Sequence, residues 1–200
     1  LTVSLAGGAT ISAGANGGNT LTLLGSQVQI NAALSTVSYR GALNFNGGDT
    51  LTVLSTDGAG VPLTDSDNVA ISITAKNDAP FFVLPTGQTT LENTSRVFSV
   101  GTGNSITLGD VDAGGATMVL FLNVTNGTVT LGGTSGLSFI LGDGTADAAV
   151  GVSGTLADLN AAMDGLIFTP TAGFTGTANF GFSLDDNGNS GSPPTSQVTI

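Results

Sequence analysis

The segment from Val69 to Pro80 reads Val-Ala-Ile-Ser-Ile-Thr-Ala-Lys-Asn-Asp-Ala-Pro. Its first five residues alternate between apolar and small side chains, which is the pattern of a strand with one buried face. Asn77, Asp78 and Pro80 then end the strand, because Asn and Asp favour turns and Pro cannot continue a central strand. The stretch therefore predicts a strand that leaves one module and a linker that leads into the next.

The composition of the whole chain extends this β pattern. The 200 residues include 31 Gly, and the apolar residues are interleaved with Thr and Ser. Such residues suit short pleated strands joined by tight turns, and they are poor helix formers. Alternation is clearest in residues 69–73, 129–131 and 180–184. We expect an all-β fold with the architecture of a β-sandwich.

Charge is scarce and almost entirely acidic, with 14 acidic and 3 basic residues and a formal net charge of −11. Nucleic acid and anionic membranes are therefore not expected partners, since few cationic groups are present to neutralise phosphates. The chain contains no run of about 18 apolar residues, which is the length that a transmembrane helix needs, so we expect no membrane insertion. Cations are the expected partners, because nearly all the acidic residues are Asp, a frequent oxygen ligand.

Cys and His are both absent from the chain. Their absence excludes disulfides, thiolate or imidazole metal sites, and catalysis by a Ser-His or Cys-His pair. A glycosidase would need two carboxylates facing each other across a cleft. Asp185 and Asp186 are adjacent and are expected on opposite faces of a strand. We therefore do not expect an enzyme.

An internal repeat divides the chain. Residues 30–71 align without a gap with residues 159–200, so that each residue matches the one 129 positions later. The shared positions are apolar residues and turn glycines, as expected for two copies of one fold. Upstream of residue 30 the sequence match is looser, and residues 8–12 align approximately with residues 127–131. The second copy has about ten extra residues around 142–147. We expect a first repeat over residues 1–78 without its first strands, and a second, nearly complete repeat over residues 79–200.

Each repeat also carries one helical signal. Thr155 followed by Asp158 resembles a capping box in front of residues 159–163. Ser26 followed by Gln29 repeats this signal in front of residues 30–34. We expect one to two turns of helix between strands in each repeat.

The chain resembles the bacterial cadherin-like, Ig-like tandem repeat of giant secreted adhesins, the extender domain of biofilm-associated and RTX-type adhesins. The matching phrases cover nearly the whole chain and include Asn77-Asp-Ala-Pro80, Thr90-Leu-Glu-Asn93, Ile106-Thr-Leu-Gly-Asp-Val-Asp-Ala-Gly-Gly115, Val124-Thr-Asn-Gly-Thr128, Gly142-Asp-Gly-Thr-Ala-Asp147, Leu156-Ala-Asp-Leu-Asn-Ala-Ala162, Phe168-Thr-Pro170 and Asp186-Asn-Gly-Asn-Ser-Gly191. The resemblance implies an Ig-like Greek-key β-sandwich, repeated many times in a large secreted or cell-surface protein. It also implies that the repeats lengthen an adhesin, with calcium between them.

By analogy with cadherins, the ligands of one calcium ion come from three stretches. The linker offers Asn77 and Asp78, the following module offers Asp110 and Asp112, and a late loop offers Asp186. Calcium takes six to eight oxygens from carboxylates, carbonyls and amide side chains.

The linker departs from the cadherin pattern. Ala75 stands where a cadherin has Asp, and Lys76 follows it. One carboxylate is therefore missing and a cation lies nearby, which predicts fewer ions at this junction than in a vertebrate cadherin.

Further candidate ligands are Asp185, Glu92, Asp57, Asp143 and Asp147. Asp57 matches Asp186 in the repeat and would serve a junction upstream, whereas Glu92 would serve one downstream. Asp143 and Asp147 lie in a Gly-rich loop that offers a second ion site. For each of these residues the alternative is a turn-forming role, because Asp side chains bond nearby backbone amides.

The predicted function is that of a structural extender module in a large bacterial extracellular protein of the adhesion or biofilm type, stiffened by Ca²⁺. Its expected partners are neighbouring repeats, with self-association or a glycan or cell surface also open. Two alternative functions remain open. One is a subunit of an extracellular fibre or surface layer that assembles through strands or lateral packing. The other is a calcium-dependent carbohydrate-binding module that uses the loops at 142–148 and 185–191.

Overall fold

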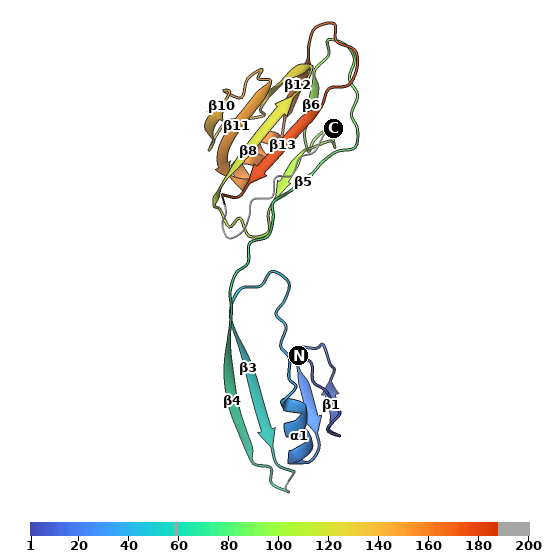
Figure 1. Ribbon diagram of the computed structural model, residues 1–200, viewed down its shortest axis with the longest axis vertical. Coiled ribbons are helices and arrows are strands. Elements are labelled where there is room, and N and C mark those ends of the chain that lie inside the picture. Colours follow the sequence, from blue (N-terminus) through green and yellow to red (C-terminus); the bar gives the residue numbers. More distant parts are fainter. Residues whose placement is uncertain (59, 188–200) are drawn as a thin grey trace. The chain divides into compact units, whose positions relative to one another are not determined.

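The computed structural model describes residues 1–58 and 60–187. It divides the chain into two compact units, unit 1 (Leu1–Ala75) and unit 2 (Lys76–Ile200). Among the described residues, strands predominate in both units and each unit contains one short helix (Figure 1). The expectation of an all-β fold is confirmed. The division falls three residues before the repeat boundary that the sequence predicts after Asp78.

The described part of unit 2, residues 76–187, is built from two larger antiparallel sheets and one strand pair. Four strands form one sheet in the order β10 (Ser138–Leu141), β11 (Ala149–Thr155), β8 (Thr117–Val124) and β13 (Phe180–Asp185). Three strands form the other in the order β6 (Arg96–Phe98), β12 (Leu166–Pro170) and β9 (Gly127–Thr130). A separate pair joins β5 (Phe81–Val83) to β7 (Thr107–Gly109).

The core of unit 2 is one cluster of buried apolar side chains from both larger sheets and from a helix. β8 contributes every second residue, as the period of two in a strand requires. Phe180 of β13 packs edge-to-face against Phe98 of β6 and Phe168 of β12, with ring centroids 5.5 and 5.3 Å apart. These ring contacts join the two sheets directly, and each buried Phe contributes about 1.5–3 kcal/mol of hydrophobic stabilisation.

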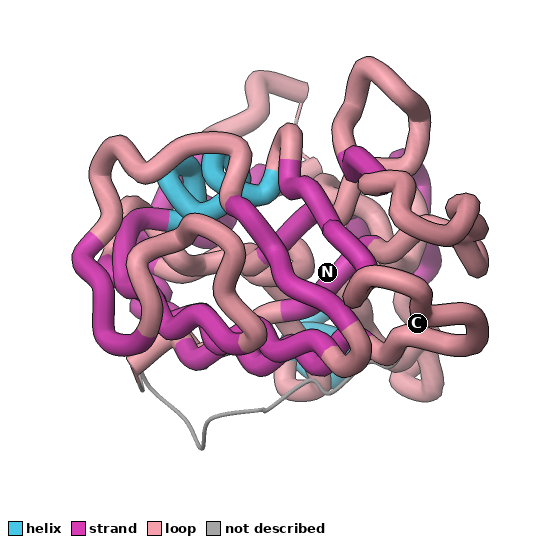
Figure 2. Tube along the Cα trace, turned by 90° about the horizontal axis from the view of Figure 1, so that it is seen from above, coloured by secondary structure: helices cyan, strands magenta, loops and turns pink. Residues whose placement is uncertain are grey.

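The predicted helices are present, α1 (Gln27–Leu34) in unit 1 and α2 (Leu156–Met163) in unit 2. Figure 2 shows both helices, in cyan, as short segments among the strands and loops. Ser26 and Gln29 form a complete capping box on α1. On α2, the Thr155 hydroxyl accepts from the Asp158 amide, and the Asp158 carboxylate accepts from that hydroxyl. Asp is too short for the full box, so α2 keeps only the first half of the motif.

A side chain on α2 fastens the helix to β7. Asn160 accepts a hydrogen bond from the Leu108 amide at 2.8 Å and donates to the Leu108 carbonyl at 3.0 Å. It thereby pairs with one strand residue as a neighbouring strand would. The contact holds the end of β7 in place, immediately before residues 110–112.

Unit 1 contains two separate hairpins. β1 (Thr10–Gly14) pairs with β2 (Leu21–Leu24), and β3 (Gly47–Thr56) pairs with β4 (Thr64–Ile73). A single bridge joins Thr2 to Ser38. The alternating segments 69–73, 129–131 and 180–184 that the sequence singles out lie in or at β4, β9 and β13, as predicted.

The strand registers show which parts of the two units correspond. In β1–β2, Ile11 pairs with Leu23, and the register then shifts before Ala13. In β10–β11, Phe139 pairs with Val152, and the register shifts in the same way before Leu141. Leu23 and Val152 are 129 residues apart, which is the spacing of the repeat.

The sequence alignment upstream of α1 is therefore wrong in detail. The β1–β2 hairpin corresponds to β10–β11, not to residues 127–131. The two hairpin loops, residues 15–20 and 142–148, differ in length by one residue and not by about ten. The Thr2–Ser38 bridge corresponds to the pairing of Thr130 with Ile167. Hairpin register depends on the turn and the bulge, which a match of Gly and Thr does not reveal.

Candidate functional site

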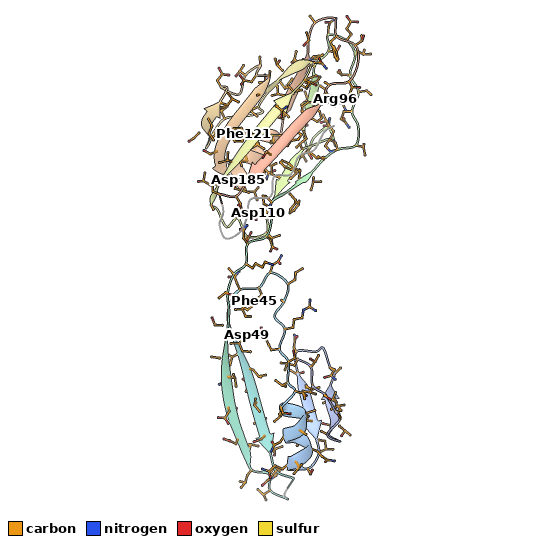
Figure 3. The ribbon with its side chains drawn as sticks, in the orientation of Figure 1. Phe45, Asp49, Arg96, Asp110, Phe121 and Asp185 are labelled. Carbon is orange, nitrogen blue, oxygen red and sulfur yellow. The ribbon has the colours of Figure 1, made fainter. Side chains whose placement is uncertain are left out.

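Three stretches of the chain that the sequence analysis singled out meet at the start of unit 2. The side-chain amide of Asn77 donates to the carboxylate of Asp186 at 2.5 Å. The backbone amide of Asp78 donates to the carboxylate of Asp112 at 3.1 Å. Figure 3 shows Asp110 and Asp185 at this same end of unit 2.

Strand pairing explains why these stretches meet. β5 begins directly after the buried Pro80, and its first residue, Phe81, pairs with Gly109, the last residue of β7. Antiparallel pairing places the start of one strand beside the end of the other. The linker before β5 therefore lies next to Asp110 and Asp112, which follow β7.

The end of β13 places Asp186 in the same region. Phe182 and Leu184 are buried, and Asp186 continues their alternation with 2% of its surface exposed. Asp185 points to the other face, where its carboxylate accepts a hydrogen bond from the Asn187 amide at 2.8 Å. The two adjacent residues thus face opposite ways, as the period of a strand predicts, and only Asp186 reaches the linker.

Asp110 has the least satisfied carboxylate in this group. Its Oδ1 accepts from the Asp112 amide at 3.0 Å. Its Oδ2 is inaccessible to solvent and has no hydrogen-bond partner among the described residues. Burial and the nearby carboxylates of Asp112 and Asp186 raise the pKa of Asp110, against the opposing effect of the Asp112 amide. The ionised form of Asp110 is therefore disfavoured in the protein alone.

Asp143 and Asp147 are engaged within their own loop. Asp147 accepts hydrogen bonds from the amides of Asp143 and Gly144, at 3.1 and 2.8 Å. Asp143 accepts from the Thr145 amide at 2.9 Å. These bonds are the turn-forming role that Asp side chains often take.

The two remaining candidates lie outside the group at the linker. Glu92 is exposed in the turn before β6 and accepts from the side chain of Asn93 at 3.0 Å. Asp57 belongs to unit 1, follows β3, and accepts from the Leu63 amide at 3.0 Å.

The arrangement offers oxygen atoms and no soft ligands. Throughout residues 1–58 and 60–187, no three Asp, Glu, His or Cys side chains are already grouped in a way that could hold a metal ion. The residues present are nevertheless of the kind that binds a hard cation such as Ca²⁺. The unpartnered Oδ2 of Asp110 is the atom that a cation would satisfy.

Sequence reasoning did not anticipate a second polar cluster, which lies in unit 2 around Arg96. The guanidinium of Arg96 donates to Gln88 at 2.6 Å, and the buried Asn104 donates to the same Gln88 oxygen at 3.1 Å. Gln88 and Arg96 line a cavity of about 490 Å³ that is also lined by Phe98, Phe168 and Phe174. The available signal was Arg96 itself, one of only 3 basic residues in the chain.

Neither helix in the described part of the chain is long and apolar enough to cross a membrane. Comparison with protein-family models, with curated proteins and with solved structures finds no match to this chain.

Proposed function

We propose that this chain is a structural extender segment of a large bacterial extracellular or cell-surface repeat protein. Its units are Ig-like Greek-key β-sandwich repeats, and Ca²⁺ bound at the start of unit 2 holds residues 76–80 against the body of that unit. The role is mechanical and involves no catalysis. The supporting observation is that Asn77, Asp78, Asp112 and Asp186 converge near Asp110, whose Oδ2 has no hydrogen-bond partner among the described residues.

Electrostatics favours a cation at this position. Burial and like charge both raise the pKa of Asp110, so ionising it alongside Asp112 and Asp186 is unfavourable in the protein alone. A divalent cation reverses the sign of this interaction, because each carboxylate is then attracted to it. Binding to the folded state alone adds stability that grows with the free calcium concentration.

The residues have distinct parts in such a site. Asp110, Asp112 and Asp186 would supply carboxylate oxygens to the ion. The Asp78 amide and the Asn77 side chain already orient two of these carboxylates from the linker. The bound ion would contribute a fixed positive charge. It would hold the carboxylates that accept hydrogen bonds from the linker, and the linker would thereby lose conformational freedom.

Thermal unfolding in Ca²⁺ and in EDTA tests this function. At a free calcium concentration of about 100 times Kd, the folded state gains about 2.7 kcal/mol and the melting temperature of unit 2 rises. The Asp186→Asn variant should lose this gain, because the buried carboxylate is neutralised. The Asp185→Asn variant is the matched control and should retain it, since Asp185 faces away from the linker and Asn can still accept from Asn187. Identical melting curves in Ca²⁺ and EDTA would rule out a calcium-stiffened module.

A further inference from the structure

The cavity beside Arg96 is formed by two loops and the strands next to them. One wall comes from residues 87–92, in the loop between β5 and β6, and the other from residues 174–178, in the loop between β12 and β13. Phe98, Phe168 and Phe180 line it from the strands. All of these residues lie well inside the described part of unit 2. Its volume of about 490 Å³ falls in the range of small-molecule sites, roughly 300–1,000 Å³.

Hydrogen bonds join the two sides of this cavity. The backbone amide of Gly173 donates to the side chain of Asn93 at 2.9 Å, which connects one loop to the other. The hydroxyls of Ser95 and Thr169 are hydrogen bonded at 2.9 Å where the loops meet the strands. The cavity is therefore held open by the fold itself, so a ligand entering it would not have to order the loops.

The backbone of β6 places Arg96 on the side of the strand that faces the core. Phe98 is 2% exposed and Val97 is 40% exposed, and Arg96 shares the side of Phe98 because side chains alternate along a strand. Arg96 pairs with Phe168 of β12, which is 6% exposed. A charged side chain thus stands at the edge of the apolar core, a position that is rare unless the charge has a partner.

Arg96 has no such partner of opposite charge within residues 1–58 and 60–187. Its side chain donates to the neutral amide oxygen of Gln88 at 2.6 Å. Its Nε is inaccessible to solvent and has no hydrogen-bond partner among these residues. A half-buried guanidinium with a single neutral acceptor has lost part of its hydration without gaining a counter-charge. An anion in the adjoining cavity would supply that charge.

The position of Arg96 is fixed by a buried side chain behind it. Asn104 is 4% exposed, and it donates to the Gln88 side chain at 3.1 Å and to the Val97 carbonyl at 2.8 Å. It also accepts from the Ser99 amide at 3.1 Å. The backbone near β6 therefore orients Asn104, which orients Gln88, which in turn holds Arg96. Support of this kind is what a preorganised binding site requires.

The rest of the cavity is largely apolar. Leu91 is 77% exposed and Phe174 is half-buried, whereas Phe98, Phe168 and Phe180 are buried. The lining therefore runs from an exposed apolar side chain to the rings of the core. A ligand with an apolar body would remove this surface from water, which is favourable.

We propose that this cavity binds a small organic acid with one carboxylate and an apolar body the size of a phenyl ring on a short alkyl chain. The carboxylate accepts hydrogen bonds from Arg96, whose planar guanidinium matches the geometry of a carboxylate. The apolar body lies among Leu91, Phe168 and Phe174. This is a ligand site in unit 2, separate from the extender role proposed above.

The charges around the cavity favour a single carboxylate over a phosphate. Arg96 is the only cation among the described residues that line it, and Glu92 is the only acid. Glu92 is exposed, so water screens its charge more than that of the half-buried Arg96. One negative charge on the ligand matches Arg96, whereas a second would have no counter-charge and would be repelled by Glu92.

The organic-acid site is independent of the proposed cation site. Figure 3 shows Arg96 toward the end of unit 2 that lies away from Asp110. None of the residues that line the cavity belongs to the group at the linker. Binding of the acid can therefore be measured in EDTA, without any contribution from calcium.

Titration of the full 200-residue chain with phenylbutyrate, followed by the amide chemical shifts in NMR spectra, provides the test. Saturable shifts are expected within residues 87–98 and 168–178. Phenylbutyramide has the same shape without the charge and should bind at least about tenfold more weakly. Butyrate keeps the charge without the ring and should also bind at least about tenfold more weakly. These comparisons use the unaltered protein, so they do not depend on the folding of a variant.

Two variants assign the charge to Arg96. Arg96→Met should weaken phenylbutyrate binding about tenfold or more and leave the weaker binding of phenylbutyramide nearly unchanged. A purely structural role of Arg96 would lower the affinity for both compounds alike. Lys76→Met is the matched control, because it removes the same charge from an exposed residue of the linker, and it should leave both affinities unchanged.

Four results would overturn the proposal. They are the absence of saturable shifts with phenylbutyrate, equal affinity for phenylbutyrate and phenylbutyramide, equal effects of Arg96→Met and Lys76→Met, and shifts centred outside residues 87–98 and 168–178.

Discussion

The side chain of Asn77 donates a hydrogen bond of 2.5 Å to the carboxylate of Asp186, 109 residues further along the chain. The bond ties the linker that precedes β5 to the residue that follows β13. Asp186 is 2% exposed, so this donor acts on a carboxylate that has little access to water. The start and the end of the described part of unit 2 are thereby held together.

The Asn77→Ala variant should destabilise unit 2. Removing a hydrogen-bond donor from a buried charged group costs about 1–3 kcal/mol, because the carboxylate keeps its desolvation penalty. Urea unfolding in EDTA measures the loss without any contribution from calcium. Asn123→Ala is the matched control, since Asn123 is exposed on the outer face of β8. Equal stability of the two variants would show that the Asn77–Asp186 bond is absent in solution.

Truncating Asn160 and Asn31 should have different effects, although the two residues match in the repeat. Asn160→Ala removes both hydrogen bonds to Leu108 and should cost unit 2 about 1–3 kcal/mol. Asn31→Ala should change the stability of unit 1 by less than about 0.5 kcal/mol, because Asn31 is exposed. Hydrogen exchange of β7 and α1 amides reports the two units separately. A large loss in unit 1 would show that Asn31 has a partner strand after all.

Tyr39 should ionise at an unusually high pH. Its hydroxyl donates to Asp49 at 2.5 Å, and this hydrogen bond, with lesser contributions from desolvation and the Asp49 charge, raises the pKa of Tyr39. The folded state therefore holds this proton above pH 10, and any stability the pair gives is lost as pH rises through the raised pKa. Tyr39 is the only Tyr and Trp is absent, so ultraviolet absorbance follows it alone.

The matched variants for this titration are Asp49→Ala and Asp67→Ala. Asp49→Ala should return the midpoint to about 10, the ordinary value for tyrosine. Asp67→Ala alters an exposed residue of β4 and should leave the midpoint raised. A wild-type midpoint equal to that of Asp49→Ala would contradict the hydrogen bond.

Local signals in the sequence predicted local structure well. Ser26 and Thr155 lie at the starts of α1 and α2, and alternating apolar residues mark β4 and β13, because caps and strand faces depend on neighbouring residues. The candidate ligands of the linker were also predicted as a group. Their proximity follows from the pairing of β5 with β7, which begins where the turn residues end.

Features that depend on distant partners were missed. The correspondence of β1–β2 with β10–β11 appears only in the paired register and its bulge. The role of Asn160 depends on β7, which is 52 residues away in sequence. No sequence motif marks the cluster of Gln88, Arg96 and Asn104, because these residues meet only when the loop before β6 folds back. The candidate residues 188–191 lie outside the described part of the chain.

The unfolding free energy of Asp110→Asn, measured against wild type in EDTA and in saturating Ca²⁺, tests whether Asp110 is a calcium ligand. In EDTA the variant should be more stable, because it removes a charge that burial and like-charged neighbours disfavour, while Asn still accepts from the Asp112 amide. In Ca²⁺ the order should reverse, because the variant has lost a ligand. A variant whose difference from wild type is the same in both conditions would contradict a calcium site at Asp110.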